Sequence, residues 1–225
     1  MNNQFEQLKQ CVRTMFDQSP IEKHPFIQVI QQKQLSPSQV KDIAIQMYFV
    51  VNHFPRFLSA ILTQIPDYKL RMPLVENLYE EHGKMNTQFV HVETYKSFLK
   101  GIGITDEIIA NTDPSIAVIA YNRSITDLCL HYPYEEGLAA LGVIEEIVAR
   151  VSPIISQYIQ NNYQDSTNMM IHFSDHETLD ITHADEIYEV VALLYNGEQK
   201  ERVERGLQLG WYYHRRLYTD LLEMI

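Results

Sequence analysis

Residues 134–163 read YEEGLAALGVIEEIVARVSPIISQYIQNNY, and this stretch decides the fold class. Its apolar residues recur at spacings of three and four, the period of one face of an α-helix. Pro153 interrupts the pattern, so we expect a long helix that bends near this proline. The rest of the chain keeps the helical period and shows no convincing strand alternation. The sequence therefore predicts an all-α protein.

Start and stop signals divide the remaining sequence into further helices. Ser19 and Ser36 each precede a proline and, three residues on, a Glu or Gln, a pattern that predicts two capping boxes. We expect helices over about 37–64, 68–81, 87–100, 113–131, from the polar stretch 164–168 to 195, and from 199 to the end. Seven to nine helices with short connections predict one compact bundle, a single domain over residues 1–225.

Composition and charge exclude several classes of protein. Apolar residues make up 45% of the chain and charged residues 21%, as in an ordinary globular domain. The formal net charge of −11 argues against nucleic acid or an anionic membrane as a partner, since both need a basic face. Two cysteines are too few for a disulfide framework, and no apolar run approaches about 18 residues. We expect a cytoplasmic protein without a signal peptide or membrane span.

The sharpest chemical signal is the motif His176-x3-Asp180-x2-His183. At about 100° per residue, these three side chains leave one face of a helix within two turns. Imidazole and carboxylate together suit a transition metal such as iron or manganese. The alternative is a polar helix face on which two histidines fall by chance.

Glu81 and His91 add a second pair of candidate ligands. On one continuous helix they would lie about 15 Å apart along the axis, too far to share an ion. Gly83 and the polar residues after it can interrupt the helix and let the two side chains converge. His82 should point elsewhere, as a surface histidine.

Glu145 supplies a carboxylate in the middle of the apolar helix over 134–163. It continues the apolar face, where a carboxylate must be paired or must hold a metal. The alternative is an internal salt bridge, for instance to Arg123 or Arg150. Glu146 lies one step round the helix and is expected in solvent.

These landmarks resemble the haem-oxygenase-like diiron oxidases and oxygenases, whose superfamily includes thiaminase-like and pyrroloquinoline-quinone-synthase-like folds. The similarity runs from residues 76–83 through His91 and 141–145 to the His176 motif, in the family's order and with similar separations. The resemblance implies that catalysis runs through two metals held by six residues: Glu81, His91, Glu145, His176, Asp180 and His183.

The resemblance also implies an activity. Similar enzymes bind two Fe(II) ions, react with O2 and act on amino acids or fatty acids, by N-oxygenation, oxidative C–C cleavage or nitrile formation. We therefore expect an O2-dependent oxidoreductase acting on a small carboxylate-bearing molecule, above all an amino acid. The candidate cations for the substrate carboxylate are Arg56, Arg123, Arg150 and Lys84. The oligomeric state, with a homodimer among the options, is left open.

Three alternatives stay open, and a fourth, the branch that consumes its own residues, is discounted. A thiaminase-like member would use a cysteine, for which Cys129 is the candidate, although a small core residue is the favoured explanation of Cys129. A quinone-synthase-like, metal-free oxidase would leave the six ligands unexplained. One branch of the family consumes its own Tyr and Lys, but residues 154–157 read IISQ and lack that lysine. The runner-up from another class is a non-enzymatic helical interaction protein.

His172 and His53 are further candidates near the metals. His172 lies four residues before His176, but Ser174 begins a possible capping box that would place His172 in a preceding turn. We expect His172 to support a ligand rather than to be one. His53 is a pocket candidate, with an ordinary buried histidine as an equal alternative.

Overall fold

The computed structural model describes the backbone of residues 3–163 and 167–225, and their side chains except those of 167–168 and 174–180. This part of the chain forms eleven α-helices and no strands, two helices more than the upper end of the expected range. The α-helices are α1 Asn3–Gln18, α2 Pro25–Gln31, α3 Pro37–Val51, α4 Phe54–Leu62, α5 Tyr68–Glu81, α6 His91–Gly101, α7 Asp106–Ala110, α8 Ile116–His131, α9 Tyr134–Asn162, α10 Thr167–Leu194 and α11 Gly197–Glu223. Short 3₁₀ turns cover Ile21–Lys23, Gly83–Met85 and Thr87–Phe89.

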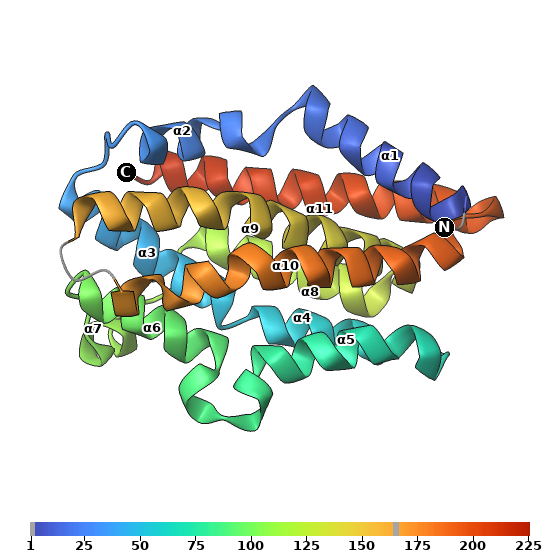
Figure 1. Ribbon diagram of the computed structural model, residues 1–225, viewed down its shortest axis with the longest axis horizontal. Coiled ribbons are helices and arrows are strands. Elements are labelled where there is room, and N and C mark those ends of the chain that lie inside the picture. Colours follow the sequence, from blue (N-terminus) through green and yellow to red (C-terminus); the bar gives the residue numbers. More distant parts are fainter. Residues whose placement is uncertain (1–2, 164–166) are drawn as a thin grey trace.

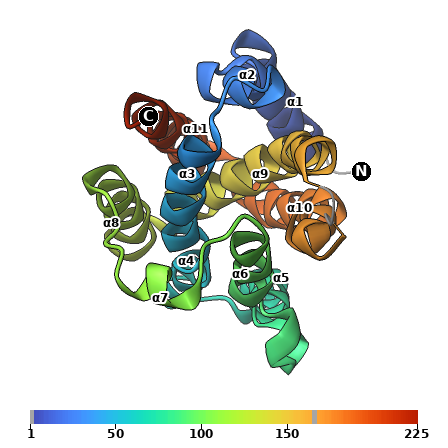
Figure 2. The same ribbon diagram turned by 90° about the vertical axis from the view of Figure 1, so that its left-hand side faces the viewer.

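Helix α9 is the centre of the bundle. It packs most extensively against α10 and α11 (Figure 1), and in the end-on view α9 and α10 lie along one side of the bundle, with α3, α4 and α8 on the other (Figure 2). Pro153 lies inside α9 without ending it. Because residues 135–145 of α9 are buried without interruption, Leu138, Leu141 and Val143 are fully buried and form the middle of the apolar core.

Helices α9 and α11 run in the same direction and approach closely at two glycines of α11. A Cβ on Gly206 would lie 2.3 Å from the carbonyl oxygen of Glu136, and one on Gly210 would lie 2.6 Å from that of Ala140. Four residues further along α11 therefore correspond to four residues further along α9. If the same pairing continues for one more turn, His214 lies opposite Ile144.

The proline positions explain where the helix boundaries differ from expectation. Ser36 forms the predicted capping box, in which its hydroxyl accepts from Gln39 N at 3.3 Å. Ser19 does not cap a helix, because Pro25 follows six residues later and would break that helix in its second turn. The chain instead makes a 3₁₀ turn and begins α2 at Pro25, with His24 as the N-cap.

The helix expected over 37–64 is two helices, α3 and α4. Pro55 lacks the N–H that would continue α3, so the chain breaks after Val51 and restarts at Phe54. In contrast, α10 runs unbroken through position 174. The capping box expected at Ser174 is therefore wrong, and His172 lies within the same helix as His176.

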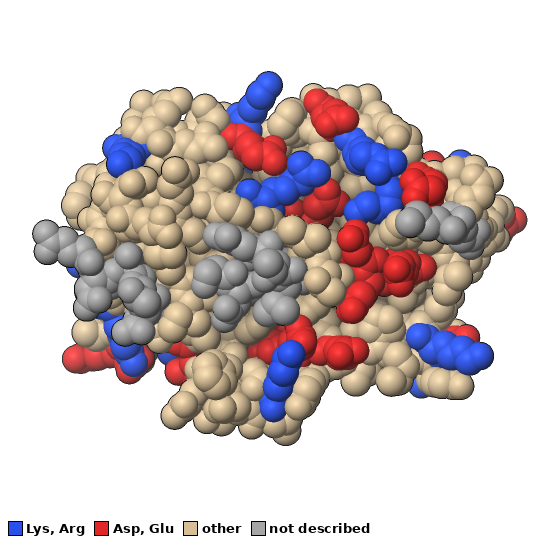
Figure 3. Space-filling model, viewed as in Figure 1, with Lys and Arg blue, Asp and Glu red and all other residues tan. Residues whose placement is uncertain are grey.

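The outer surface mixes charges of both signs. Figure 3 shows Lys and Arg interspersed with Asp and Glu on the face that carries α1 and α10, where Lys9 pairs with Asp185 at 2.7 Å. No helix within residues 3–163 or 167–225 combines the length and the apolar character needed to cross a membrane.

Candidate metal centre and cavity

The junction between α5 and α6 brings Glu81 and His91 together. Glu81 ends α5, and three successive residues with positive φ, Gly83, Lys84 and Met85, turn the chain back. His91 begins α6, and its Nδ1 lies 2.9 Å from Glu81 Oε1, with both side chains buried. The expectation that Gly83 interrupts the helix and lets these two side chains converge is confirmed.

Glu145 faces α5 from the central helix. Its side chain is 3% exposed, and Oε1 accepts a hydrogen bond of 2.7 Å from Asn77 Nδ2, one turn before Glu81 on α5. Neither arginine considered from the sequence pairs with it. Arg150 binds the half-buried Glu146 at 2.7 Å, and Arg123 lies in a separate groove. An internal salt bridge to either arginine is therefore not formed, and an ionisable side chain of the described residues that does approach Glu145 is His183, at 3.9 Å.

His183 projects from α10 toward the same place. Its Nε2 lies 2.9 Å from Glu80 Oε2, and its buried Nδ1 lies 3.9 Å from Glu145 Oε1. Within the described part of the chain this Nδ1 has no hydrogen-bond partner. An ionised carboxylate only accepts, so Nε2 carries a hydrogen, and in the neutral tautomer this leaves the lone pair on Nδ1.

Glu80 is the residue of this cluster that the sequence did not single out. Besides His183 it binds Lys84, whose Nζ lies 2.6 Å from Oε1. Burial alone would raise the pKa of Glu80, but hydrogen bonds from Lys84 and His183 outweigh burial and lower it. The sequence feature that could have identified Glu80 is the consecutive pair Glu80 and Glu81 at the end of α5. Only one of two consecutive helical residues can face α9, so the other is free to face α10. His82 is exposed, as expected.

His172 stands beside this cluster on α10. Its Nδ1 lies 3.0 Å from the hydroxyl of Thr94 on α6, and its ring centre lies 6.3 Å from that of His91. The structure therefore places His172 next to a predicted ligand, held by a second helix.

Two of the six predicted ligands, His176 and Asp180, have side chains outside the described residues. Their backbone belongs to α10, so the spacing argument applies to one continuous helix that also carries His183. Among the side chains that are described, no three donors are grouped closely enough to hold one ion. The six-residue ligand set stays a prediction.

The described donors fit iron in their chemistry. Carboxylates and imidazoles suit iron, and Glu81 and Glu145 are carboxylates buried in the bundle interior. A ligating histidine usually donates its other N–H to a carboxylate, which fixes the tautomer and the ring orientation. His183 shows this arrangement with Glu80, and its unpartnered Nδ1 is the atom that a metal would use.

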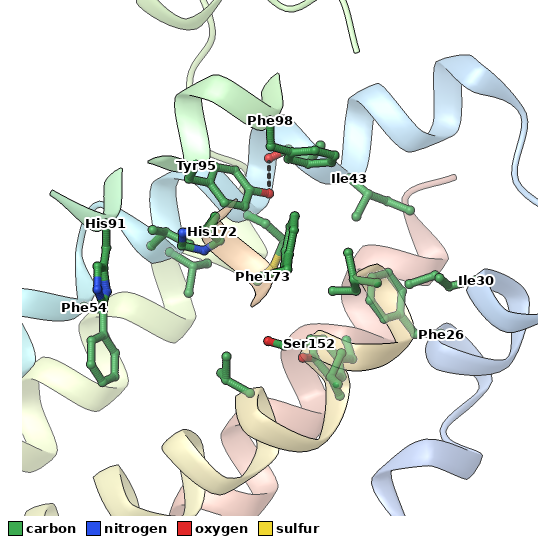
Figure 4. Close-up of a pocket in the computed structure, with 18 of the residues that line it drawn as sticks. Phe26, Ile30, Ile43, Phe54, His91, Tyr95, Phe98, Ser152, His172 and Phe173 are labelled. Carbon is green, nitrogen blue, oxygen red and sulfur yellow. Dashed lines mark hydrogen bonds between the residues drawn. The ribbon is translucent and has the colours of Figure 1, made fainter. Parts of the chain in front are cut away.

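An apolar cavity of about 160 Å³ extends from this cluster. Glu81, His91, Glu145 and His172 form one part of its wall. The rest is largely aliphatic and aromatic and comes from α2, α3, α4, α6, α8, α9, α10 and α11, with Phe26, Tyr95, Phe98 and Phe173 visible in Figure 4. Within the described residues no Lys or Arg lines this cavity.

The cations expected to meet a substrate carboxylate lie elsewhere. Arg56 and Arg123 line an open polar groove of about 770 Å³ on the outside of the bundle, between α4 and α8. His53 lies in that groove too, with Nε2 3.0 Å from the Thr126 hydroxyl, and not beside Glu81 or Glu145. Arg150 and Lys84 are engaged with Glu146 and Glu80.

Cys129 is poorly suited to nucleophilic chemistry. Its side chain is fully buried in the core, and burial raises the pKa of the thiol to about 12. It does not line the cavity. Because the thiolate is the reactive form, this environment favours a structural role for Cys129 over a thiaminase-like one.

The architecture and the cluster agree with a family of known proteins. Residues 41–222 match the iron-containing redox enzymes, and the chain belongs to this family. A curated relative is a 4-aminobenzoate synthase from Chlamydia pneumoniae, 28% identical over 187 residues that cover 83% of this chain and 82% of the relative.

Solved structures confirm the haem-oxygenase-like fold. A CADD-like protein of unknown function from Nostoc punctiforme superposes with a TM-score of 0.84 at 18% identity, covering 99% of each chain. A domain from Shewanella denitrificans, described as having a heme oxygenase-like fold, gives a TM-score of 0.78 at 18% identity, covering 97% of this chain and 92% of that domain.

Proposed function

We propose that this protein is an O2-dependent non-haem diiron oxidase or oxygenase that acts on a small molecule. The observation that carries the proposal is the buried carboxylate–imidazole cluster of Glu81, His91, Glu145 and His183, of which the first three line an apolar cavity. Membership of the iron-containing redox enzymes supports it. The ions would be held by these four residues together with His176 and Asp180.

The chain's own residues position the ligands and keep water out. Asn77 holds Glu145 from α5, and Glu80 holds His183 by its Nε2 hydrogen. When bound, two Fe(II) ions would supply electrons for the reduction of O2. The aliphatic and aromatic walls would exclude water from the reacting groups and strengthen the electrostatic interactions inside.

The cavity favours a substrate with a compact apolar body. An apolar cavity of about 150 Å³ accommodates a molecule such as benzene, so the cavity here suits an aromatic ring or a short branched chain. Because no described cation lines it, the charged groups of an amino acid would lie at the carboxylate–imidazole end. We propose an amino acid with an apolar side chain, oxidised by N-oxygenation, C–C cleavage or nitrile formation.

An anaerobic Fe(II) titration followed by an oxygen pulse tests the proposal. We expect binding of two Fe(II) ions per chain, followed by O2 consumption and conversion of leucine, phenylalanine or tyrosine, but not of serine or aspartate, detected by mass spectrometry. Glu145→Gln should lose one or both ions, whereas His53→Gln, in the outer groove, should bind iron normally. A chain that binds no stoichiometric iron would refute the proposal and favour a non-enzymatic interaction protein.

The relatives suggest a second product to measure in the same experiment, 4-aminobenzoate. The cavity wall includes Tyr95, Tyr121, Tyr158 and Tyr218 but, in the described chain, no lysine. A route that consumes an internal tyrosine and lysine is therefore disfavoured. A mass loss from the protein itself, with 4-aminobenzoate released, would support that route instead.

A further inference from the structure

We propose that His214 binds an uncharged oxygen of the substrate, a hydroxyl or a carbonyl, through its Nε2 atom. The inference rests on the proposed function in that it describes the occupant of the same cavity. It narrows the substrate from an apolar molecule to an apolar molecule that carries a hydrogen-bonding oxygen toward α11.

His214 is a buried polar side chain with one unsatisfied atom. It is 1% exposed and lines the cavity. Its Nδ1 lies 2.9 Å from the hydroxyl of Tyr121 on α8, whereas Nε2 has no hydrogen-bond partner in the described part of the chain. A buried polar atom without a partner costs free energy and is rare, so it points to a missing group.

A comparison with His24 shows what a structural histidine looks like in this protein. His24 caps α2 by accepting from Phe26 N at Nδ1, and its Nε2 lies 3.2 Å from the Thr219 hydroxyl. Both ring nitrogens of His24 are therefore used. In His214 one nitrogen is used by the fold, and the other is buried without a partner in the described part of the chain, on a side chain that lines the cavity.

The chemistry of His214 favours an uncharged partner. Burial lowers the pKa of this imidazole to about 3, so the ring is neutral at physiological pH. The Tyr121 hydroxyl can either donate to Nδ1 or accept from it, which leaves Nε2 a donor or an acceptor accordingly. The pair can thus bind a hydroxyl or a carbonyl oxygen, but it provides no charge for a carboxylate.

The position of His214 orients the substrate. By the register of α9 and α11, His214 lies opposite Ile144, and Tyr218 follows one turn later opposite Val148; all four line the cavity. Ile144 and Glu145 are consecutive and lie about 100° apart around α9. Glu145, the predicted ligand on α9, and His214, which lies opposite Ile144, therefore reach the cavity on different sides of α9.

Other hydroxyls extend the polar patch along the cavity. Tyr218, whose ring centre lies 4.7 Å from that of His214, and Ser152, one turn beyond Val148, also line it. Figure 4 shows Ser152 on α9, on the opposite side of the pocket from Tyr95 and Phe173. We expect these hydroxyls to assist His214 in an otherwise apolar wall.

The test compares p-cresol with p-xylene, two molecules of almost the same shape that differ by a hydroxyl in place of a methyl group. Both are titrated against the full-length chain loaded with Fe(II) without oxygen. We expect His214→Phe to lower the ratio of p-cresol to p-xylene affinity roughly tenfold or more, because the hydroxyl loses its buried partner. Tyr95→Phe is the matched control. It removes a cavity hydroxyl already bonded to Ala44 O, so the ratio should not change.

If the ratio of p-cresol to p-xylene affinity is unchanged in His214→Phe, the proposal is overturned. Binding of p-cresol at the iron instead of at His214 would give this result. If this variant does not fold, wild-type chain with ¹⁵N-labelled histidine gives the answer. The His214 Nε2 resonance should shift with p-cresol and not with p-xylene, and the absence of such a difference would equally overturn the proposal. Iron loading is measured before each titration and neither readout requires turnover, so failure here is distinguishable from failure to bind iron.

Discussion

Glu80 shows how one side chain can select the chemistry of another. His183 could offer either ring nitrogen to a metal, but Glu80 accepts the Nε2 hydrogen at 2.9 Å and leaves Nδ1 toward Glu145. Lys84 holds Glu80 in turn. The orientation of the predicted ligand is therefore set by two residues that need not touch the metal.

We predict that Glu80→Ala weakens Fe(II) binding roughly 10- to 100-fold, the usual effect of removing the carboxylate behind a ligating histidine. Anaerobic titration followed by equilibrium dialysis measures it. Glu93→Ala is the matched control, since Glu93 on α6 also pairs with a lysine, Lys96, at 2.7 Å, but away from the cluster. Equal iron affinity in the two variants would show that Glu80 does not orient a ligand.

At this scale the sequence could identify residues by their helical spacing but not by their tertiary partners. Glu145 stood out as a carboxylate on an apolar face, and the structure shows it buried there. Glu80 and His214 did not stand out, because each gains its role from another helix, α10 and α8 respectively. Such cross-helix pairs follow from the packing of the bundle, which no local pattern encodes.

The α5–α6 junction is the element on which the cluster depends. Two helices that continued straight would separate Glu81 from His91, whereas the positive-φ turn brings them to 2.9 Å. Gly83 has φ of +62°, and a Cβ there would lie 2.5 Å from Phe89 C and from Val90 N. Only glycine fits this turn, since both the backbone angle and the space exclude a side chain.

We predict that Gly83→Ala lowers the free energy of unfolding by about 2–3 kcal/mol and also weakens iron binding, because the turn must open to admit the methyl group. Urea unfolding and iron titration measure the two effects. Gly197→Ala is the control, since Gly197 has φ of +50° but open space around its Cβ. It should cost about 1 kcal/mol of backbone strain and leave iron binding unchanged. A similar loss of iron binding in both variants would contradict this role for the turn.

The element scale also shows the limit of start and stop signals. Gly83 and Ser36 were interpreted correctly because the turn and the cap each depend on a few neighbouring residues. The prediction of a single helix over 37–64 was wrong at Pro55. The apolar pattern runs through this position and favours a continuous helix, but the proline breaks it. Helix α7 has only five residues, too few for a periodic signal.

At the scale of the whole molecule, buried neutral histidines link folding to pH. Burial lowers the pKa of His214 to about 3 and that of His24 to about 4, against an ordinary value of 6.5. In the unfolded chain both would take up a proton as the pH falls below about 6.5. The folded chain resists this protonation, so stability is complete above pH 6.5 and falls on acidification until the folded pKa is reached.

We therefore predict that the chain loses stability between pH 7 and pH 5 and that His214 accounts for about 2 kcal/mol of the loss, from a folded pKa near 3 and an unfolded pKa near 6.5. Urea unfolding of the metal-free chain at the two pH values measures this. His214→Gln keeps a polar side chain but cannot titrate, so its stability should fall by about 2 kcal/mol less than that of the wild type over the same interval. His24 and the carboxylates titrate alike in both proteins, and the difference between the two losses therefore isolates His214. Equal losses would mean that the pKa of His214 is nearly the same in the folded and the unfolded chain, which would contradict the lowering of this pKa by burial.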